Sequence, residues 1–158
     1  MKSYKLPSVF PKKVITEKLA ATEPEGVIRE LVNLAVKADM VSASVVDDLV
    51  HALTTREREG STGIGGGVAI PHIKTDLVDG VVGAIGRSEH GIDFNAVDGE
   101  PVYIFFCFFA PHDQTEAHLE VLKKISSMVR NKLYCQFMRQ AKKNADIHDI
   151  LKEFEEGS

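Results

Sequence analysis

The sequence predicts an α/β protein in which one sheet lies between two layers of helices. The run Val102–Phe109 is apolar without alternation, which is typical of a central strand buried on both faces. Amphipathic helix patterns occur both before and after this run. The 158 residues, of which 44% are hydrophobic, suit one domain with a sizeable core. Together these observations predict a three-layer α/β/α sandwich, formed as a single domain by residues 1–158 with a core from about residue 6 to residue 155.

The first part of the chain is expected to contain a short strand and a helix. An irregular segment at residues 7–11 precedes a strand at Val14–Ile15. A helix then begins near Thr22, because Thr22 and Glu25 have the spacing of a capping box and Pro24 lies in the first turn. Its inward stripe consists of Ile28, Leu31, Ala35 and Ala38.

A second helix follows, and it ends beside a run of glycines. Ser42 or Ser44 is expected to cap its N-terminus, and Gly60 ends it. Its inward face consists of Val46, Leu49 and Leu53. Arg56 continues this face within one turn of the C-terminus, so its stem packs while its guanidinium emerges beside the following loop. An arginine at this position also has an ordinary explanation in the helix dipole.

The middle of the chain is expected to supply the sheet and the last part to supply helices. Strands are expected at Val68–Ile70, Val81–Gly86 and Val102–Phe109. Turn residues occupy Asp93–Pro101. Asp113 and Glu116 again have capping-box spacing and open a helix that runs to about Arg130. Two further helices are expected at Lys132–Ala141 and Ala145–Glu155.

Composition excludes several classes of function. The formal charge of −4 gives no general affinity for nucleic acid or for an anionic membrane. No apolar run approaches the length of a membrane span, and no signal-peptide pattern follows residues 1–5. Cys107 and Cys135 are isolated and form no disulfide framework, which fits a reducing compartment. The sequence therefore predicts a cytoplasmic protein with no nucleic-acid partner and no direct membrane insertion.

The most informative stretch is Thr62–His72, a glycine-rich loop that leads through a short apolar strand to a proline and a histidine. Glycines lack a Cβ, so the loop backbone can approach a ligand closely. Pro71 fixes its own φ and holds Ile70 extended, which places His72 on a stiff segment beside backbone N–H groups that can face an anion. This combination predicts a histidine that meets phosphate. Taken alone, the stretch is better explained as a tight turn followed by a surface histidine, and other residues are needed to support a phosphate role.

Two common nucleotide motifs do not fit this stretch. A P-loop requires Lys followed by Ser or Thr directly after the glycines, and no such pair occurs here. A Rossmann fingerprint requires G-x-G-x-x-G and then a helix, whereas Gly63–Val68 lacks the last glycine and leads into a strand. Nucleotide binding by either route is not predicted.

His118 interrupts the apolar face of the helix after Thr115. At 100° per residue it lies near the middle of the face formed by Leu119, Val121, Leu122, Ile125, Met128 and Val129. A lone histidine on such a face is more often a core residue than a functional one.

The other polar residues give weaker signals. Asp76 or Asp79 could orient the ring of His72, and both fit a solvated loop equally well. The remaining histidines are interpreted as surface residues: His51, His90, His112 and His148. No histidine pair has the spacing of a zinc site, so neither a metal nor a cofactor is predicted.

Taken together, these residues resemble a known family. The similarity lies in the string Arg56-Glu57-x-x-x-x-Thr62-Gly63-Ile64-Gly65-x-Gly67-x-Ala69-Ile70-Pro71-His72, followed by Gln114 and His118-Leu119-x-x-Leu122. It is similar to the enzyme IIA (EIIA, type-2) domains of the bacterial phosphotransferase system (PTS), of the fructose/mannitol class and its nitrogen-regulatory branch. The resemblance covers nearly the whole chain. It implies an α/β sandwich with a mixed sheet and a role as a phosphoryl carrier.

The resemblance also implies partners and residue roles. The residue matching His72 accepts a phosphoryl group on Nε2 from the small carrier HPr or a paralogue, and passes it to a IIB domain or signals its phosphorylation state. His118 matches the second active-site histidine, which stabilises the phosphoryl group, and Arg56 matches an arginine that stabilises charge. Thr62, Gly63 and Gly65 are expected to form the phosphoryl-binding loop.

Three functions remain open at this stage. The first is a phosphoryl carrier for sugar uptake. The second is a regulatory protein-binding module with no sugar-transport role, whose contacts change when His72 is phosphorylated. The third is a degenerate domain that only binds, and the presence of Arg56, His72 and His118 together argues against it.

Overall fold

The computed structural model describes residues 4–157, which form one mixed sheet flanked by helices. The strands are β1 Ile15–Thr16, β2 Gly63–Gly65, β3 Val68–Ala69, β4 His72–Lys74, β5 Val82–Ile92 and β6 Val102–Ala110. They are ordered β1-β5-β6-β3-β2, and β4 pairs with β6 beyond the end of β3. Residues 1–3 and 158 of the expected domain lie outside the described residues.

Strand β6 is the centre of the sheet, as its continuous apolar run predicts. It pairs antiparallel with β5 and parallel with β3 and β4. Every residue of β6 is buried except the half-buried Tyr103. A strand covered on both faces needs apolar side chains in both directions, which explains the lack of alternation.

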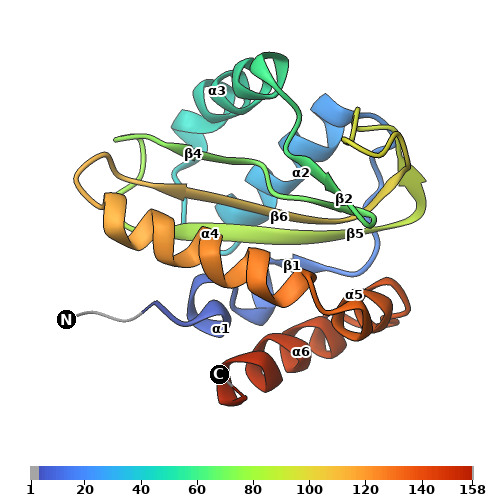
Figure 1. The fold of residues 1–158 in the computed structure, drawn as a ribbon. Coiled ribbons are helices and arrows are strands. Elements are labelled where there is room, and N and C mark those ends of the chain that lie inside the picture. Colours follow the sequence, from blue (N-terminus) through green and yellow to red (C-terminus); the bar gives the residue numbers. More distant parts are fainter. Residues whose placement is uncertain (1–3, 158) are drawn as a thin grey trace.

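Helices cover both faces of the sheet and confirm the three-layer α/β/α architecture. They are α1 Leu6–Val9, α2 Pro24–Lys37, α3 Val46–Glu59, α4 Thr115–Val129, α5 Lys132–Arg139 and α6 Asn144–Glu156. Figure 1 shows α2 and α3 on one side of the sheet and α1, α4, α5 and α6 on the other. Within residues 4–157, no helix combines the length and the apolar character needed to cross a bilayer.

Two of the expected helix caps are wrong. Helix α2 is capped by Glu23 and not by Thr22: the Glu23 carboxylate accepts hydrogen bonds from the N–H groups of Gly26 (2.5 Å) and Glu25 (3.2 Å). A charged carboxylate also interacts favourably with the positive end of the helix dipole. At α4 the N-cap is Gln114, and it makes no side-chain capping bond.

A third expected cap is also wrong, because the N-cap of α3 is Val45, which makes no side-chain capping bond. Ser42 accepts a hydrogen bond from the Ser44 N–H at 3.3 Å, but it caps a 3₁₀ turn, Ala43–Val45, that leads into α3. Gly60 follows the last residue of α3, as expected.

Other differences concern short elements and boundaries. The segment 7–11 includes most of α1, and Val14 belongs to a 3₁₀ turn at Lys12–Val14 ahead of β1. Strand β5 runs six residues beyond the expected Gly86, because its pairing with β6 continues to Ile92. Strands β2 and β4 were not expected, since three residues are too few to show a periodic pattern.

Candidate functional site

His72 is the first residue of β4 and lies against the central strand. Its backbone is in register with Phe108 of β6, and the Phe108 N–H donates a hydrogen bond of 3.0 Å to the Pro71 carbonyl. The rings of His72 and Phe108 stack with centroids 5.4 Å apart and planes 12° apart. Backbone pairing and ring stacking therefore fix both the position and the plane of the imidazole.

A backbone carbonyl sets the tautomer of His72. The Nδ1 atom lies 2.5 Å from the Ile70 carbonyl oxygen. A carbonyl only accepts hydrogen bonds, so Nδ1 carries the hydrogen and Nε2 carries the lone pair. Burial lowers the pKa of His72 below its ordinary value, the Ile70 hydrogen bond opposes this shift, and the positive charge of Arg56 adds to it. The ring is accordingly a neutral imidazole with Nε2 as its nucleophilic atom.

His118 is the second histidine of the site and comes from the first turn of α4. It is 7% exposed, and its ring centroid lies 5.3 Å from that of His72 and 5.1 Å from that of Phe108. Its Nε2 atom is buried and has no hydrogen-bond partner among the described residues. Burial lowers the pKa of His118 to about 4, with smaller contributions from His72 and Lys74. His118 is therefore neutral near pH 7.

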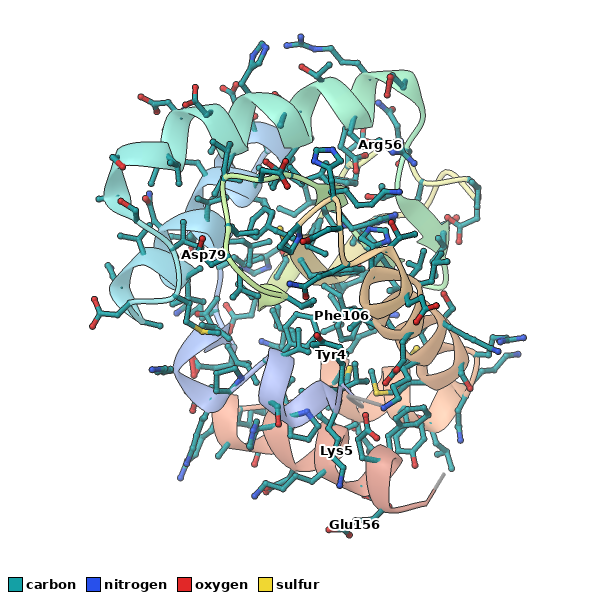
Figure 2. The ribbon with its side chains drawn as sticks, turned by 90° about the vertical axis from the view of Figure 1, so that its left-hand side faces the viewer. Tyr4, Lys5, Arg56, Asp79, Phe106 and Glu156 are labelled. Carbon is teal, nitrogen blue, oxygen red and sulfur yellow. The ribbon has the colours of Figure 1, made fainter. Side chains whose placement is uncertain are left out.

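Arg56 lies at the end of α3, where the sequence places it. Its Nη1 donates a hydrogen bond of 2.7 Å to the Gly60 carbonyl, one of the carbonyls that the end of the helix leaves without an intrahelical partner. Figure 2 shows Arg56 at the end of α3 that leads into the glycine loop. The half-buried side chain remains within electrostatic range of His72.

These three residues meet at one open cavity of about 400 Å³. Its lining comes from α3, from β4, from the loop after β6 and from α4: Ala52, Thr55, Arg56, Glu59, His72, Ile73, Lys74, His112 and His118. Besides His112 and the carboxylate of Glu59, the lining has two neutral imidazoles, a guanidinium and an ammonium. Its cations therefore outnumber its carboxylates, which suits an anionic group that is bonded to a ring nitrogen.

The hairpin formed by β2 and β3, together with Thr62 before it, contacts residues outside the cavity around His72. Buried Thr62 donates both its N–H (3.0 Å) and its hydroxyl hydrogen to the Glu57 carboxylate. Gly63 packs against Ala96, where a Cβ would lie 2.9 Å from the Ala96 Cα. Gly65 has φ +94° and lies beside Asp98. None of Thr62, Gly63 and Gly65 is among the residues that line the cavity around His72, so a direct role for them in phosphoryl binding stays a prediction.

The acidic residues after His72 do not orient its ring. Asp76 pairs with His112, whose Nδ1 lies 3.3 Å from the carboxylate and whose N–H donates to it at 3.1 Å. Asp79 is exposed and lies well away from Arg56 in Figure 2. The group that orients His72 is the Ile70 carbonyl, which sequence reasoning missed because a backbone oxygen has no residue type of its own.

The remaining histidines divide into two groups. His51, His90 and His112 are exposed, as expected, but His112 also lines the cavity. No sequence signal indicated this, because β4 itself was not expected; in the structure β4 and β6 are parallel and end at the same edge, and His112 follows the end of β6. His148 is half-buried, with Nε2 3.4 Å from the Pro7 carbonyl oxygen, so its interpretation as a surface residue is wrong. Within residues 4–157, no group of three or more His, Cys, Asp or Glu side chains could hold a metal ion.

Comparison with known proteins gives consistent matches. A family model described as "Phosphoenolpyruvate-dependent sugar phosphotransferase system, EIIA 2" matches residues 8–154. A PTS system fructose-specific EIIA component of Haloferax volcanii is 34% identical over 146 residues, which is 92% of this chain and 94% of that protein. A nitrogen regulatory protein of Klebsiella oxytoca is 37% identical over 123 residues, 76% of this chain and 73% of that protein.

A solved structure shares the fold. The crystal structure of the nitrogen regulatory protein IIA-Ntr from Neisseria meningitidis superposes with a TM-score of 0.84 at 29% identity. The superposition covers 92% of this chain and 98% of that one. This chain therefore shares its mixed sheet and two helical layers with that protein.

Proposed function

This chain belongs to the EIIA 2 family of the phosphoenolpyruvate-dependent sugar phosphotransferase system, and from that premise we propose that it carries a phosphoryl group on Nε2 of His72. One observation supports this most directly. The Ile70 carbonyl holds the hydrogen of the ring on Nδ1, and His72 lines an open cavity together with His118 and Arg56. A neutral imidazole in this tautomer is a nucleophile that needs no separate base.

The proposed step is an in-line exchange between two histidines. The Nε2 lone pair of His72 attacks the phosphorus of a phosphohistidine on the donor, forming a new N–P bond. The donor's N–P bond breaks, and its electron pair returns to the donor imidazole. The His72 ring then bears the phosphoryl group on Nε2 and hydrogen on Nδ1, and the Ile70 carbonyl stabilises the positive charge that the ring gains.

Two further residues act on the transferred group. Phosphoryl transfer requires mainly positioning and stabilisation of the equatorial oxygens. We assign that role to an N–H of His118, whose ring lies 5.3 Å from that of His72, and to the guanidinium of Arg56. Because His118 is neutral, it donates a hydrogen bond without adding a charge that would oppose protonation of the phosphorylated ring.

The proposal extends to partners and cellular context. An HPr-type phosphocarrier is the donor, and the acceptor is a IIB domain or a regulatory protein that reads the phosphorylation state. We place the carrier in the cytoplasm, in keeping with its two free cysteines, and regard residues 1–158 as a single domain of this type.

The test is phosphorylation with phosphoenolpyruvate, enzyme I and HPr. The wild-type chain should acquire one acid-labile, alkali-stable phosphate, and mass spectrometry should locate it on His72. His72→Ala should acquire none. His51→Ala, which removes an exposed histidine of α3, is the matched control and should be labelled normally. Full labelling of His72→Ala would overturn the proposal.

A regulatory role is the second candidate, and the similarity to two nitrogen regulatory proteins favours it. The string Arg56-Glu57-x-x-x-x-Thr62-Gly63-Ile64-Gly65 points in the same direction. The two roles differ in what removes the phosphate. A sugar-transport carrier is discharged by its IIB domain, whereas a regulatory module retains its phosphate when IIB domains are added and binds a regulatory partner in only one of its two states.

A further inference from the structure

A long segment of this acidic chain contains no acidic residue. Residues 121–145 include seven lysines and arginines and no aspartate or glutamate, although the whole chain has a net charge of −4. The cations are Lys123, Lys124, Arg130, Lys132, Arg139, Lys142 and Lys143. The segment comprises most of α4, all of α5 and the start of α6.

Most of these cations have no ionic partner within the protein. Lys124 is half-buried and pairs with Glu120 and Glu155. The other six are exposed, and within residues 4–157 no ion pair involves any of them. An unneutralised positive surface on a negatively charged protein attracts an anionic partner to one defined place.

Three of the cations line a groove beside α5. Its volume is about 650 Å³, and Arg130, Lys132 and Arg139 contribute to its lining together with the apolar Val129 and the half-buried Cys135. Gly66, Gln136 and Gln140 complete the lining, so it contains no carboxylate.

Arg139 is held in place before any partner binds. Its guanidinium carbon lies 3.8 Å from the centre of the Tyr103 ring, a cation–π contact. Its backbone carbonyl accepts a hydrogen bond of 2.7 Å from Nε of the buried Arg87. A side chain fixed in this way loses little conformational entropy on binding.

Helix α5 also exposes two large apolar side chains. Leu133 is 58% exposed and Phe137 is 49% exposed, and their spacing of four residues places them on one face of the helix. Covering the part of each side chain that is still exposed removes apolar surface from water and stabilises a complex. Two neighbouring apolar side chains beside the exposed cations of the same helix combine the apolar and the charged contacts that protein-binding surfaces use.

We propose that α5 and its groove form a docking surface for an acidic protein segment that carries apolar side chains. A bilayer is flat and would leave the groove unfilled, whereas a polypeptide segment fills it. A small anion would neutralise Arg130 and Arg139 but leave Leu133 and Phe137 uncovered. An acidic segment with apolar side chains pairs with the cations and also covers Leu133 and Phe137.

This surface is separate from the phosphoryl site. Figure 1 shows α5 on the side of the sheet opposite α3 and far from β4, and the groove shares no residue with the cavity around His72. A partner bound at α5 therefore leaves His72 accessible. The proposal does not depend on phosphoryl transfer, and it stands or falls on its own experiment.

Binding of a synthetic probe to the full-length protein tests the proposal. The probe is a fluorescein-labelled glutamate-rich peptide with two phenylalanines one helical turn apart, and its charge-reversed lysine counterpart is the control peptide. Fluorescence anisotropy should show saturable binding of the acidic peptide that weakens as salt is added. The amide NMR signals that change should be those of α5 and of the groove.

Surface variants separate the apolar and charged contributions. Phe137→Ser should weaken binding about four- to tenfold, because a partner can bury only the half of this side chain that is still exposed, which is worth about half of a full burial. Lys132→Glu combined with Arg139→Glu should remove both binding and its salt dependence. Lys37→Glu, at an exposed lysine at the end of α2, is the matched charge control and should bind like wild type.

Four results would overturn the proposal: equal binding of the two peptides; NMR changes centred on His72; association with phosphatidylserine vesicles but not with the acidic peptide; and complete reproduction of the α5 changes by inorganic phosphate. Circular dichroism of each variant confirms that it is folded, and Leu133→Ser provides a second apolar variant should Phe137→Ser prove unstable.

Discussion

The hairpin of β2 and β3 and the short strand β4 follow one another within residues 63–74, yet they serve the molecule differently. The hairpin is held by structural contacts with Glu57, Ala96 and Asp98. Strand β4 places His72 at an open cavity beside residues from α3 and α4. Neighbouring residues of one sequence motif therefore need not all lie in the functional site. A motif of this kind combines a scaffold segment with a chemical one.

The largest difference between residues of the site and residues of the scaffold should appear in the rate of phosphoryl transfer. His118→Ala should still accept phosphate from HPr, but about 10²–10³-fold more slowly, because one stabilising group at the phosphoryl oxygens is lost. Thr62→Ser, directly before the hairpin, should transfer at the wild-type rate. Rapid-quench measurement of labelled protein gives both rates. An equal loss in the two variants would break the distinction between scaffold and site.

A substitution in the hairpin should lower the stability of the protein. A Cβ on Gly63 would lie 2.9 Å from both the Cα and the Cβ of Ala96, so Gly63→Ala forces two backbone segments apart. Overpacking of this kind costs about 1–3 kcal/mol. The melting temperature should fall by roughly 2–4 °C for each kcal/mol in a protein of this size. Gly60→Ala is the control, since no atom lies within 4 Å of a Cβ at that position.

The same Gly63→Ala substitution should leave the rate of phosphoryl transfer unchanged. At temperatures well below its melting point, Gly63→Ala should carry phosphate on His72 as quickly as wild type does. A slow but fully folded Gly63→Ala protein would instead support the direct role in phosphoryl binding that the sequence predicts for this loop.

Acid should lower the unfolding free energy of the protein through the buried histidines of the site. In the unfolded chain a histidine titrates near pH 6.5, whereas the pKa of His118 in the fold is about 4. Between these values the unfolded chain binds a proton that the folded chain does not, so stability should fall as the pH decreases from 6.5 to 4 and be fully retained above 6.5. His72, whose pKa is also lowered, adds to this trend.

Urea unfolding at pH 7 and pH 5 measures the effect. The difference in unfolding free energy between the two pH values should be smaller in His118→Asn, which removes the titrating group, than in wild type. His51→Ala, at an exposed position, should leave the difference unchanged. An unchanged difference in His118→Asn would show that burial of this ring does not control acid sensitivity.

The sequence was sufficient for features that depend on side-chain pattern. The unbroken apolar run of β6 predicted the centre of the sheet, and the position of His118 on the α4 stripe predicted a buried ring. Leu119, expected on the same apolar face, is 56% exposed, because the buried stripe follows His118, Val121, Ile125 and Met128. The pattern identified the helix correctly and misjudged one edge of its buried face.

Features that depend on the backbone or on distant contacts were beyond the sequence. The Ile70 carbonyl orients His72, and its role follows only from the turn between β3 and β4. Asp76 lies four residues after His72 but pairs with His112, because the loop after β4 meets the end of β6. The motif includes Glu57 without indicating its role, and its hydrogen bonds to Thr62 across the end of α3 show that the pair holds the start of the hairpin.

The smallest expected effect concerns that buried pair. Thr62→Val removes the hydroxyl that donates to the Glu57 carboxylate but leaves the backbone N–H at 3.0 Å. It should therefore cost about 1.5 kcal/mol in unfolding free energy, the lower end of the range for a hydrogen bond to a charged group. Burial already raises the pKa of Glu57, and the two Thr62 hydrogen bonds oppose that shift. Without the hydroxyl the pKa should rise further, and the cost should be greatest where Glu57 is ionised and decrease as the pH is lowered and the carboxyl becomes protonated. Urea unfolding of Thr62→Val and of Thr62→Ser, which keeps the hydroxyl, measures this directly. If the two variants were equally stable at neutral pH but Thr62→Val alone transferred phosphate slowly, Thr62 would belong to the chemical segment, and the boundary between scaffold and site would lie before the hairpin.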